Sequence, residues 1–342
     1  MDNSDILILK GGEVVDLLSG REAAVIAAVQ MAYEAHRREQ SSLPPSTFLR
    51  FPDSQRNRII ALPAYLGGEA GGAGIKWVSS FPENVGQGMN RASAVVILNS
   101  PLTGLPYLIA EGSIISAKRT AASAALAART LHTGREVTEF AVIGCGVINF
   151  EIVRFVLSVF PGIKTLFLHD LSAARAELFR DLCESTFSGV AAKAVKDVHT
   201  LLRAASLISI ATTAIEPYIA DFSGVAPGST VLHISLRDLA PEIILNFDNV
   251  VDDIDHVCRA QTSVHLAEQR TGSRGFIRCT LADVTTGTQP ARLDSDSIVI
   301  FSPFGLGVLD IAVSKLVYDL SLKNGKGTVV ESFLPDAWGQ KT

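Results

Sequence analysis

Hydrophobic residues follow two spacings along this chain, and the two alternate over much of its length. Short apolar runs predict buried strands over Phe140–Ile143, Lys164–Leu168, Leu207–Ala211, Val231–Ser235, Asn249–Asp252 and Ser297–Ser302. Between the first strands, apolar residues return at helical spacing and predict helices over Val147–Phe160 and Ser172–Glu184. Strands that alternate with helices are typical of a parallel sheet. We therefore expect one open parallel α/β sheet between about residues 135 and 300.

The part of the chain before this sheet shows a different pattern. Helices are predicted over Arg21–Arg38 and over the alanine-rich segment Ser113–Leu131. Strands are predicted over Gly74–Pro82, Ala94–Asn99 and Leu105–Ala110. Because these strands are short and are joined by tight turns, they favour an antiparallel sheet. A last helix, predicted over Gly307–Leu322, would return the chain to this first region.

Length and composition are those of a soluble globular protein with two domains. The 342 residues exceed the size at which one hydrophobic core keeps growing, and 47% of them are hydrophobic. The net charge of −5 argues against a nucleic acid or an anionic membrane as a partner. No apolar stretch approaches the roughly 18 residues of a membrane span, and the acidic start lacks a secretory signal. The four cysteines are scattered, which favours reduced thiols in the cytoplasm and argues against a metal site.

The most informative functional signal is the Gly144-Cys145-Gly146 turn, which follows the first strand of the parallel sheet. Glycines at such a turn let the backbone approach the pyrophosphate of a dinucleotide, and the N–H groups at the helix start can bind it. The next strand ends at Asp170, whose carboxylate would accept hydrogen bonds from the ribose hydroxyls and favour NAD over NADP. Alternatively, Asp170 only caps the next helix. Asn149 stands where the usual fingerprint has its last small residue.

Charged side chains outside the glycine turn are candidates for substrate chemistry. Lys76 lies in an otherwise apolar strand, so it either faces solvent or serves a buried site. Arg119 lies on a helix of small residues that would let a carboxylate approach, and a surface position is the alternative. Asp238 follows a strand of the parallel sheet, at the carboxyl edge where ligands bind. Arg50 is a further cationic candidate, whereas His233 lies inside a strand and is predicted to be structural.

Several motifs are spaced along most of the chain: Gly74–Trp77, Pro82–Asn84, Thr103–Pro106, Arg119–Ala124, Ile143–Gly146 and Phe304–Asp310. Together they resemble those of the ornithine cyclodeaminase/μ-crystallin family. The resemblance implies an NAD(P)-dependent homodimer that acts on a small amino-acid-derived substrate. It also implies a substrate-binding and dimerisation domain over residues 1–125, completed by residues 306–342, and an NAD-binding Rossmann domain over residues 126–305.

The resemblance assigns roles to single residues as well. By motif match, Arg50, Lys76 and Arg119 would bind substrate carboxylates, and Lys76 would also take part in catalysis. Asp238 would be the catalytic acid, and Asp310 would lie beside the loop that faces the nicotinamide. The expected cofactor contacts are Gly144, Cys145, Gly146, Val147, Ile148, Asp170, Thr212, Arg119, Thr120 and Asp310.

One position separates this chain from the cyclodeaminases of the family. Ile60 aligns with the glutamate that holds the side-chain amine of ornithine in those enzymes, so ornithine cyclisation is not expected. The segments Phe48–Arg50 and Arg58–Pro63 instead resemble the N-(2-amino-2-carboxyethyl)-L-glutamate dehydrogenases. That branch implies NAD-dependent oxidative cleavage to 2,3-diaminopropionate and 2-oxoglutarate in siderophore biosynthesis. The alternatives are a lysine or ornithine cyclodeaminase, an alanine dehydrogenase, a ketimine reductase, or a non-catalytic μ-crystallin-like binding protein.

Overall fold

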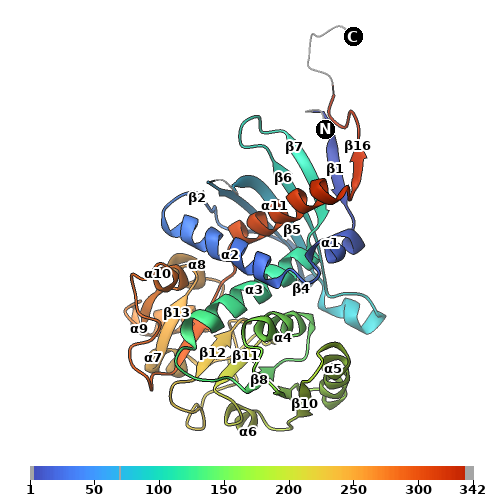
Figure 1. Cartoon of the computed structure of the whole chain (residues 1–342). Helices are drawn as coiled ribbons and strands as arrows, with labels where there is room; N and C mark the ends of the chain where they lie inside the picture. Colours follow the sequence, from blue (N-terminus) through green and yellow to red (C-terminus); the bar gives the residue numbers. More distant parts are fainter. Residues whose placement is uncertain (1–3, 69–70, 336–342) are drawn as a thin grey trace. The chain divides into compact units, whose positions relative to one another are not determined.

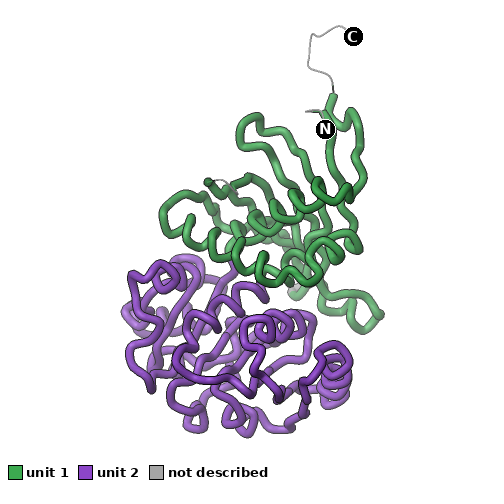
Figure 2. Tube along the Cα trace, viewed as in Figure 1, with its two compact units in different colours: residues 1–119, 306–342 green, residues 120–305 purple. Residues whose placement is uncertain are grey.

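The computed structural model describes residues 4–68 and 71–335, and the chain divides into two compact units (Figure 2). Unit 1 consists of residues 1–119 and 306–342, and unit 2 of residues 120–305. The outer ends of the predicted first domain, residues 1–3 and 336–342, lie outside the described residues. Within the described ranges, no helix combines the length and the hydropathy that a membrane crossing requires.

Unit 1 is an α+β unit built on one sheet (Figure 1). Its elements are β1 (Ile6–Leu9), α1 (Gly11–Leu18), α2 (Glu22–Arg37), β2 (Ser41–Ser42), β3 (Thr47–Phe51), β4 (Ser54–Leu66), β5 (Gly72–Ser80), the 3-10 helix η1 (Pro82–Gln87), β6 (Ala92–Asn99), β7 (Pro106–Glu111), the start of α3 (Ser113–Leu131), α11 (Gly307–Asn324) and β16 (Thr328–Val330). The strand order is β16-β1-β7-β6-β5-β4-β2, and β3 also pairs with β4.

The predicted antiparallel pairing is right for the three predicted strands, β5 to β7, but one pair of the sheet departs from it. β1 and β7 run parallel. A parallel pair needs a long connection, and the segment from β2 to β6, which lies between them in the chain, is part of that connection. The predicted strand Gly74–Pro82 ends at Ser80, since Pro82 begins the 3-10 helix. Sequence reasoning did not identify β1 to β4 or β16.

The two faces of this sheet differ in burial. Lys76 in β5 lies opposite Leu62 in β4 and Val96 in β6, so these side chains share one face. Helix α11 contacts β4, β5 and β6, and Lys76 and Val96 are buried. The opposite face carries Trp77 and Val95, which remain exposed. Alternation along the strands therefore separates a buried face with a charged residue from an open apolar face.

Residues from the C-terminal part of the chain complete unit 1. Helix α11 is buried along much of its length and packs on α2 and on the sheet. Gly74 in β5 permits this close approach, since an added Cβ would lie 3.1 Å from the side chain of Ile311 and 2.2 Å from the carbonyl oxygen of Ile97. Strand β16 then pairs antiparallel with β1, with Ile6 opposite Val330.

Unit 2 is a parallel α/β unit. After the end of α3, its elements are β8 (Glu139–Ile143), α4 (Val147–Val159), β9 (Thr165–His169), α5 (Ala173–Thr186), β10 (Ala191–Ala194), α6 (Val198–Leu202), β11 (Leu207–Ile210), β12 (Thr230–His233), α7 (Pro241–Asn246), β13 (Asp248–Val251), α8 (Ile254–Val257), α9 (Ser263–Thr271), β14 (Ile277–Thr280), α10 (Leu281–Thr285) and β15 (Val299–Ser302).

All strand pairs of this second sheet are parallel, in the order β10-β9-β8-β11-β12-β15-β13-β14. The strand order reverses beside β8. The next two strands in the chain, β9 and β10, lie on one side of β8, and the later strands lie on the other side, as in a Rossmann-type fold. Strands β11, β12 and β15 are buried at every position, which explains why most of their residues are apolar. The predicted class, a Rossmann-type parallel sheet with a second α+β unit completed by C-terminal residues, is confirmed.

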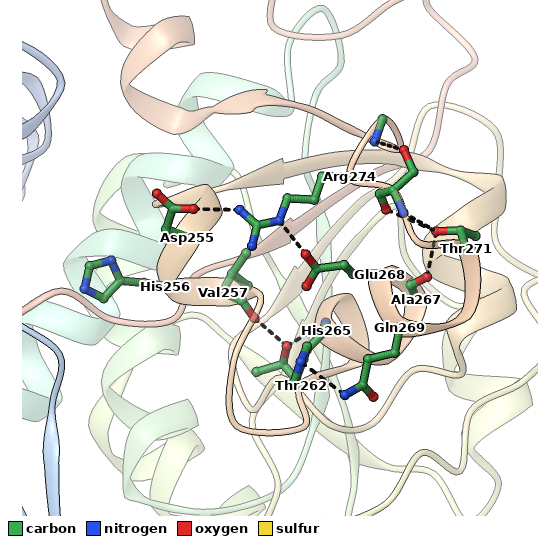
Figure 3. Close-up of polar contacts among 12 residues, drawn as sticks. Asp255, His256, Val257, Thr262, His265, Ala267, Glu268, Gln269, Thr271 and Arg274 are labelled. Atoms are coloured by element: carbon green, nitrogen blue, oxygen red, sulfur yellow. Dashed lines mark hydrogen bonds and ion pairs between the residues drawn. The ribbon is translucent and has the colours of Figure 1, made fainter.

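A polar network fastens α8 and α9 within unit 2 (Figure 3). Arg274 donates hydrogen bonds to Glu268 in α9 and to Asp255 in α8, each at 2.6 Å. Thr262 caps the start of α9 and donates its hydroxyl to the carbonyl oxygen of Val257 at 2.6 Å. Because Arg274 and Asp255 are exposed, their ion pair contributes little to stability. The network therefore serves to position two short helices.

Candidate functional site

Lys76 is a buried cation of unit 1. The side chain belongs to β5, and the residue is only 2% exposed. Its Nζ donates hydrogen bonds to Oδ2 of Asp310 in α11 at 2.7 Å and to Oγ of Ser116 in α3 at 3.0 Å. The alternative in which Lys76 faces solvent is therefore wrong. Alternation in a strand cannot decide which face is covered, and here the covering helix comes from the far end of the chain.

Arg119 binds the same aspartate. It lies in α3, is 9% exposed, and donates from Nε to Oδ1 of Asp310 at 3.0 Å. The surface-arginine alternative is thus wrong as well. Each carboxylate oxygen of Asp310 holds one cation, and we call this group the Lys76–Arg119–Asp310 cluster. Asp310 lies in the first turn of α11, where the helix dipole also favours a negative charge.

The cluster holds two cations and one anion, so its net charge is +1. Burial would raise the pKa of Asp310, but the charges of Arg119 and Lys76 lower it below its ordinary value. Burial lowers the pKa of Lys76 to about 8, with Arg119 acting in the same direction and Asp310 against it. Below that pH the cluster carries a spare positive charge in a site that water barely reaches. Such a site favours a small anion, and a carboxylate suits its N–H donors.

Arg50, the third predicted carboxylate ligand, has a different setting. It lies on β3 opposite Arg58, is exposed, and its guanidinium lies 5.6 Å from the ring centre of Phe48. Among the described residues, no hydrogen bond or ion pair joins Arg50 to the Lys76–Arg119–Asp310 cluster. The structure thus brings two of the three predicted cations together and leaves Arg50 on the outer part of the sheet.

The glycine turn of unit 2 has the geometry of a close backbone approach. Gly144 has a φ of +92°, and an added Cβ would lie 2.4 Å from the carbonyl oxygen of Ala211, so only glycine fits. A Cβ on Gly146 would meet nothing within 4 Å, so the start of α4 faces open space. Asp170 accepts hydrogen bonds at 2.9 Å from the backbone N–H groups of Cys145 and Ser172. The carboxylate therefore lies beside the turn and also orders the start of α5.

Asn149 occupies the last small position of the glycine fingerprint, and its hydrogen bonds show how the turn accommodates a larger residue there. Its side chain is fully buried, and its amide donates to the carbonyl oxygens of Ile143 at 2.8 Å and Gly144 at 2.6 Å. The amide oxygen accepts from the hydroxyl of Ser209 in β11 at 2.7 Å. Asn149 therefore ties α4 to β8 and β11 through hydrogen bonds where other sequences rely on close packing. It points into the sheet and does not block the turn.

Apolar side chains are exposed around this turn. Val147 follows β8, Leu171 follows β9 and Ile215 follows β11, and they are 68%, 97% and 83% exposed. These are neighbouring strands of one parallel sheet, so all three residues lie at its carboxyl edge. Exposed apolar groups that gather at such an edge are typical of a surface that contacts a ligand.

The predicted cofactor contacts Val147 and Ile148 form the first turn of α4, beside the glycines. Thr212 follows β11 at the same edge of the sheet, where its hydroxyl donates to Asp238. Thr120 lies on α3, directly after Arg119, at the point where unit 2 begins. The structure thus groups Val147, Ile148 and Thr212 with the turn.

Asp238 is fully buried behind hydroxyl groups. Its carboxylate accepts hydrogen bonds from Thr212 and Ser235, and its backbone N–H donates to Nε2 of His233 at 3.3 Å. Burial would raise the pKa of Asp238, but hydrogen bonds and charge from its neighbours His233, Ser235 and Thr212 lower it. Asp238 is therefore ionised at neutral pH. Leu236 has a φ of +69°, so the loop that carries this group is strained.

Sequence reasoning missed several polar partners of these candidates. Ser116 lies one helical turn before Arg119, a spacing that places both on one side of α3. Ser235 lies three residues before Asp238, which is a common spacing for a hydroxyl that bonds a carboxylate. His233 was predicted to be structural, and its ring indeed links β12 to the Asp238 loop and, at 3.2 Å, to Ser302.

Among the described residues, no group of three or more His, Cys, Asp or Glu side chains is arranged to hold a metal ion.

Comparisons with known proteins place this chain among enzymes of amino-acid metabolism. The N-((2S)-2-amino-2-carboxyethyl)-L-glutamate dehydrogenase of Staphylococcus aureus is 27% identical over 97% of this chain and 100% of its own length. The Thermococcus litoralis Delta(1)-pyrroline-2-carboxylate reductase, solved with NADH and L-proline, is 25% identical with a TM-score of 0.87, covering 94% of this chain and 99% of that one. An archaeal alanine dehydrogenase, solved as a dimer with bound NAD, is 27% identical with a TM-score of 0.84, covering 96% and 99%.

The sequence profile of the ornithine cyclodeaminase/mu-crystallin family matches residues 14–325, which include both the cluster of unit 1 and the glycine turn of unit 2. The match spans nearly all of both units and agrees with the motifs seen in the sequence. This chain therefore belongs to the ornithine cyclodeaminase/mu-crystallin family.

Proposed function

We propose that this chain is an NAD-dependent dehydrogenase that acts on the CH–NH bond of an amino-acid derivative. Its full-length relatives include dehydrogenases and reductases of such compounds. The observation that carries the proposal is the Lys76–Arg119–Asp310 cluster, a buried site with one spare positive charge. A protein that bound only a nucleotide would gain nothing from two buried cations with a single counter-ion, since burying charges costs free energy.

Unit 2 offers the groups that NAD needs. When bound, NAD supplies the acceptor for a hydride. The open side of Gly146 and the free N–H groups of the first turn of α4 suit the pyrophosphate. Asp170 suits the ribose hydroxyls, and because its charge would repel a 2′-phosphate, NAD is preferred to NADP. The exposed Val147 and Leu171 would cover the faces of an adenine ring.

Unit 1 would bind the carboxylate of the substrate. Lys76 donates to Asp310 and Ser116, and Arg119 donates to Asp310 through Nε, which leaves one N–H of Lys76 and the terminal N–H groups of Arg119 for a carboxylate. Asp310 holds both cations in place and offsets part of their repulsion. A substrate carboxylate would then complete a charge-balanced group of two cations and two anions.

For the specific reaction, we propose the oxidative cleavage of N-(2-amino-2-carboxyethyl)-L-glutamate. The glutamyl Cα–H bond breaks as a hydride leaves, the secondary amine loses its proton, and a C=N bond forms. Water adds to that carbon, and cleavage of the C–N bond then releases 2-oxoglutarate and 2,3-diaminopropionate. In sum, the substrate, NAD and water give these two products, NADH and one proton.

Asp238 would accept the protons that this reaction releases. Its pKa is held below the ordinary value, so at neutral pH the carboxylate is ionised, which is the form that can accept a proton. Because the carboxylate is buried, a proton would reach it through the hydroxyl of Ser235 or Thr212, both of which bond to it. These hydroxyls are part of the proposed path for the proton.

We further propose that the chain forms a homodimer through the open face of the unit 1 sheet. Trp77, Val95, Tyr65 and Leu49 share this face and are exposed. A continuous apolar sheet face of this kind is typical of an interface between subunits. The related alanine dehydrogenase was solved as a dimer.

The decisive experiment is a substrate panel followed by NADH absorbance and, for L-ornithine and L-lysine, by ammonia release, because their cyclisation returns the hydride to the substrate and leaves no net NADH. The proposal predicts NADH and 2-oxoglutarate from N-(2-amino-2-carboxyethyl)-L-glutamate, and much slower turnover of L-alanine, L-proline, L-ornithine and L-lysine. Asp238→Asn should keep NAD binding and lose at least about 100-fold in kcat, the usual contribution of a general base. Faster turnover of one of the single-carboxylate substrates would assign another reaction of the family, and a wild type that binds NAD but turns over none would favour a binding protein.

A further inference from the structure

Arg50, Arg56, Arg58 and Arg91 lie together in unit 1, and we call them the arginine group. Arg50 in β3 is directly opposite Arg58 in β4. Arg56 precedes Arg58 by two residues on the same strand, and Arg91 directly precedes β6. The group therefore gathers where β4 begins and β5 ends. Strand β2 pairs with the other end of β4.

This group has no counter-ion among residues 4–68 and 71–335. In that part of the chain, no carboxylate forms an ion pair with any of the four guanidinium groups, and the buried Nε of Arg58 has no hydrogen-bond partner. Burial lowers the pKa of Arg58, and the charge of Arg50 lowers it further. Burial likewise lowers the pKa of Arg91, with the charges of Arg58 and Arg56 acting in the same direction. Close like charges of this kind are unfavourable unless an anion binds them.

Two members of the arginine group, Arg50 and Arg58, share a sheet face with the Lys76–Arg119–Asp310 cluster. Arg58 lies opposite Ser80 in β5, and Ser80, Val78 and Lys76 alternate onto one face. Ser80 lies four residue steps beyond Lys76 along β5, which corresponds to about 13 Å of backbone. Ile60 lies opposite Val78 between the two cationic groups. A substrate with carboxylates spaced along a short chain would find one cationic group at each end of an apolar strip.

We propose that Arg58 is a specificity-determining residue that binds, together with Arg50 opposite it, the additional carboxylates of a polycarboxylate amine. The Lys76–Arg119–Asp310 cluster has charge for one carboxylate only, so a substrate with two or three needs further cations. Two guanidinium groups can each bind a carboxylate through two parallel N–H bonds. The identity of the substrate rests on the proposed function, whereas the preference of this site for several carboxylates does not.

Binding without turnover tests the assignment directly. Isothermal titration calorimetry would compare tricarballylate, which has three carboxylates and no amine, with acetate, which has one. We expect the wild type to bind tricarballylate at least about tenfold more tightly than acetate. Arg58→Gln should weaken tricarballylate binding by about tenfold and change acetate binding less than about twofold. Arg38→Gln, at the exposed arginine that directly follows α2, is the matched control and should change neither.

The kinetic counterpart separates this inference from the proposed function. With N-(2-amino-2-carboxyethyl)-L-glutamate, Arg58→Gln should raise KM about tenfold with kcat within about twofold, and Arg58→Lys should recover part of the loss. If tricarballylate binds through Arg58 but this substrate yields no NADH, the proposed reaction is wrong and the polycarboxylate site stands. The assignment is overturned if the wild type does not prefer tricarballylate, or if Arg58→Gln weakens both ligands equally. It is also overturned if that variant behaves like Arg38→Gln, or loses binding only because its dimer dissociates in sedimentation.

Discussion

Replacing Asp310 with asparagine tests whether the buried cluster of unit 1 is held by charge. In the wild type, the two carboxylate oxygens bind Lys76 at 2.7 Å and Arg119 at 3.0 Å. The asparagine side chain has nearly the same size but no charge, so two buried cations would lose their counter-ion. Removing one partner of a buried ion pair costs about 3–5 kcal/mol. At roughly 2–4 °C per kcal/mol for a unit of this size, Asp310→Asn should lower Tm by about 6 °C or more.

The pH dependence of this loss gives a second, independent check. The pKa of Lys76 is about 8 in the folded chain, below the ordinary value of 10.5, and loss of the Asp310 charge lowers it further. A buried cation with a lowered pKa reduces stability below that pKa, and the penalty disappears as the pH rises through the ordinary value. The stability difference between Asp310→Asn and the wild type should therefore be largest near pH 6 and smaller near pH 9.

The assay is thermal and urea unfolding followed by circular dichroism at both pH values. Asp319→Asn is the matched control, because Asp319 is an acid of the same helix that pairs with Lys315 at the surface, at 2.6 Å and 53% exposure. Removing that exposed pair should cost no more than about 1 kcal/mol. The reasoning is refuted if Asp310→Asn unfolds at the same temperature as Asp319→Asn, or if its deficit grows as the pH rises.

Three further predictions concern the cofactor turn and the charge of the substrate site. Asp170→Asn should raise KM for NAD about tenfold and reduce the preference over NADP, since a charge-assisted hydrogen bond is lost; initial rates with both cofactors measure this, and an unchanged ratio contradicts it. Asn149→Leu leaves two carbonyl oxygens and the Ser209 hydroxyl without the partners they have in the wild type. NAD affinity and Tm should therefore both fall, with a loss of about 1–3 kcal/mol of stability per group. Calorimetry that finds neither change rejects this role of Asn149. The inhibition constant of 2-oxoglutarate, which has no amine of its own, should rise above about pH 8 as Lys76 loses its proton. Lys76→Arg should remove this dependence on pH. An inhibition constant of the wild type that stays the same from pH 7 to 10 counts against the role of the lysine.

The parallel sheet was predictable because its signal is local. Six of its strands stand out as apolar runs in the sequence, whereas β10 and β14 carry Lys193 and Arg278 and were not predicted. The edges of the unit 1 sheet were not predictable in this way. β1 pairs with β7 and with β16, and Ile6 meets Val330 from the opposite end of the chain. Pairing of that kind depends on tertiary packing, which strand patterns alone do not encode.

The candidate site shows the same division. The sequence indicated Lys76, Arg119 and Asp310 as candidates, but it left the orientation of Lys76 and Arg119 open. Their burial follows from α11, which brings Asp310 to both cations. Asp310 lies 191 positions after Arg119 in the chain. Asn149 was visible as a departure from the glycine fingerprint, yet its compensation required Ser209, a small polar residue inside a buried strand. Hydrogen bonds between distant polar residues depend on three-dimensional placement and leave little trace in hydrophobic periodicity.

The central claim is that this protein transfers a hydride from the Cα of an acidic secondary amine to NAD. The most direct measurement uses N-(2-amino-2-carboxyethyl)-L-glutamate with deuterium at the glutamyl Cα, followed by mass spectrometry of the nicotinamide product. We expect singly deuterated NADH in equal amount to 2-oxoglutarate, and a slower hydride step than with the unlabelled substrate. Reduced cofactor without deuterium, or 2-oxoglutarate released without any reduced cofactor, would contradict direct hydride transfer.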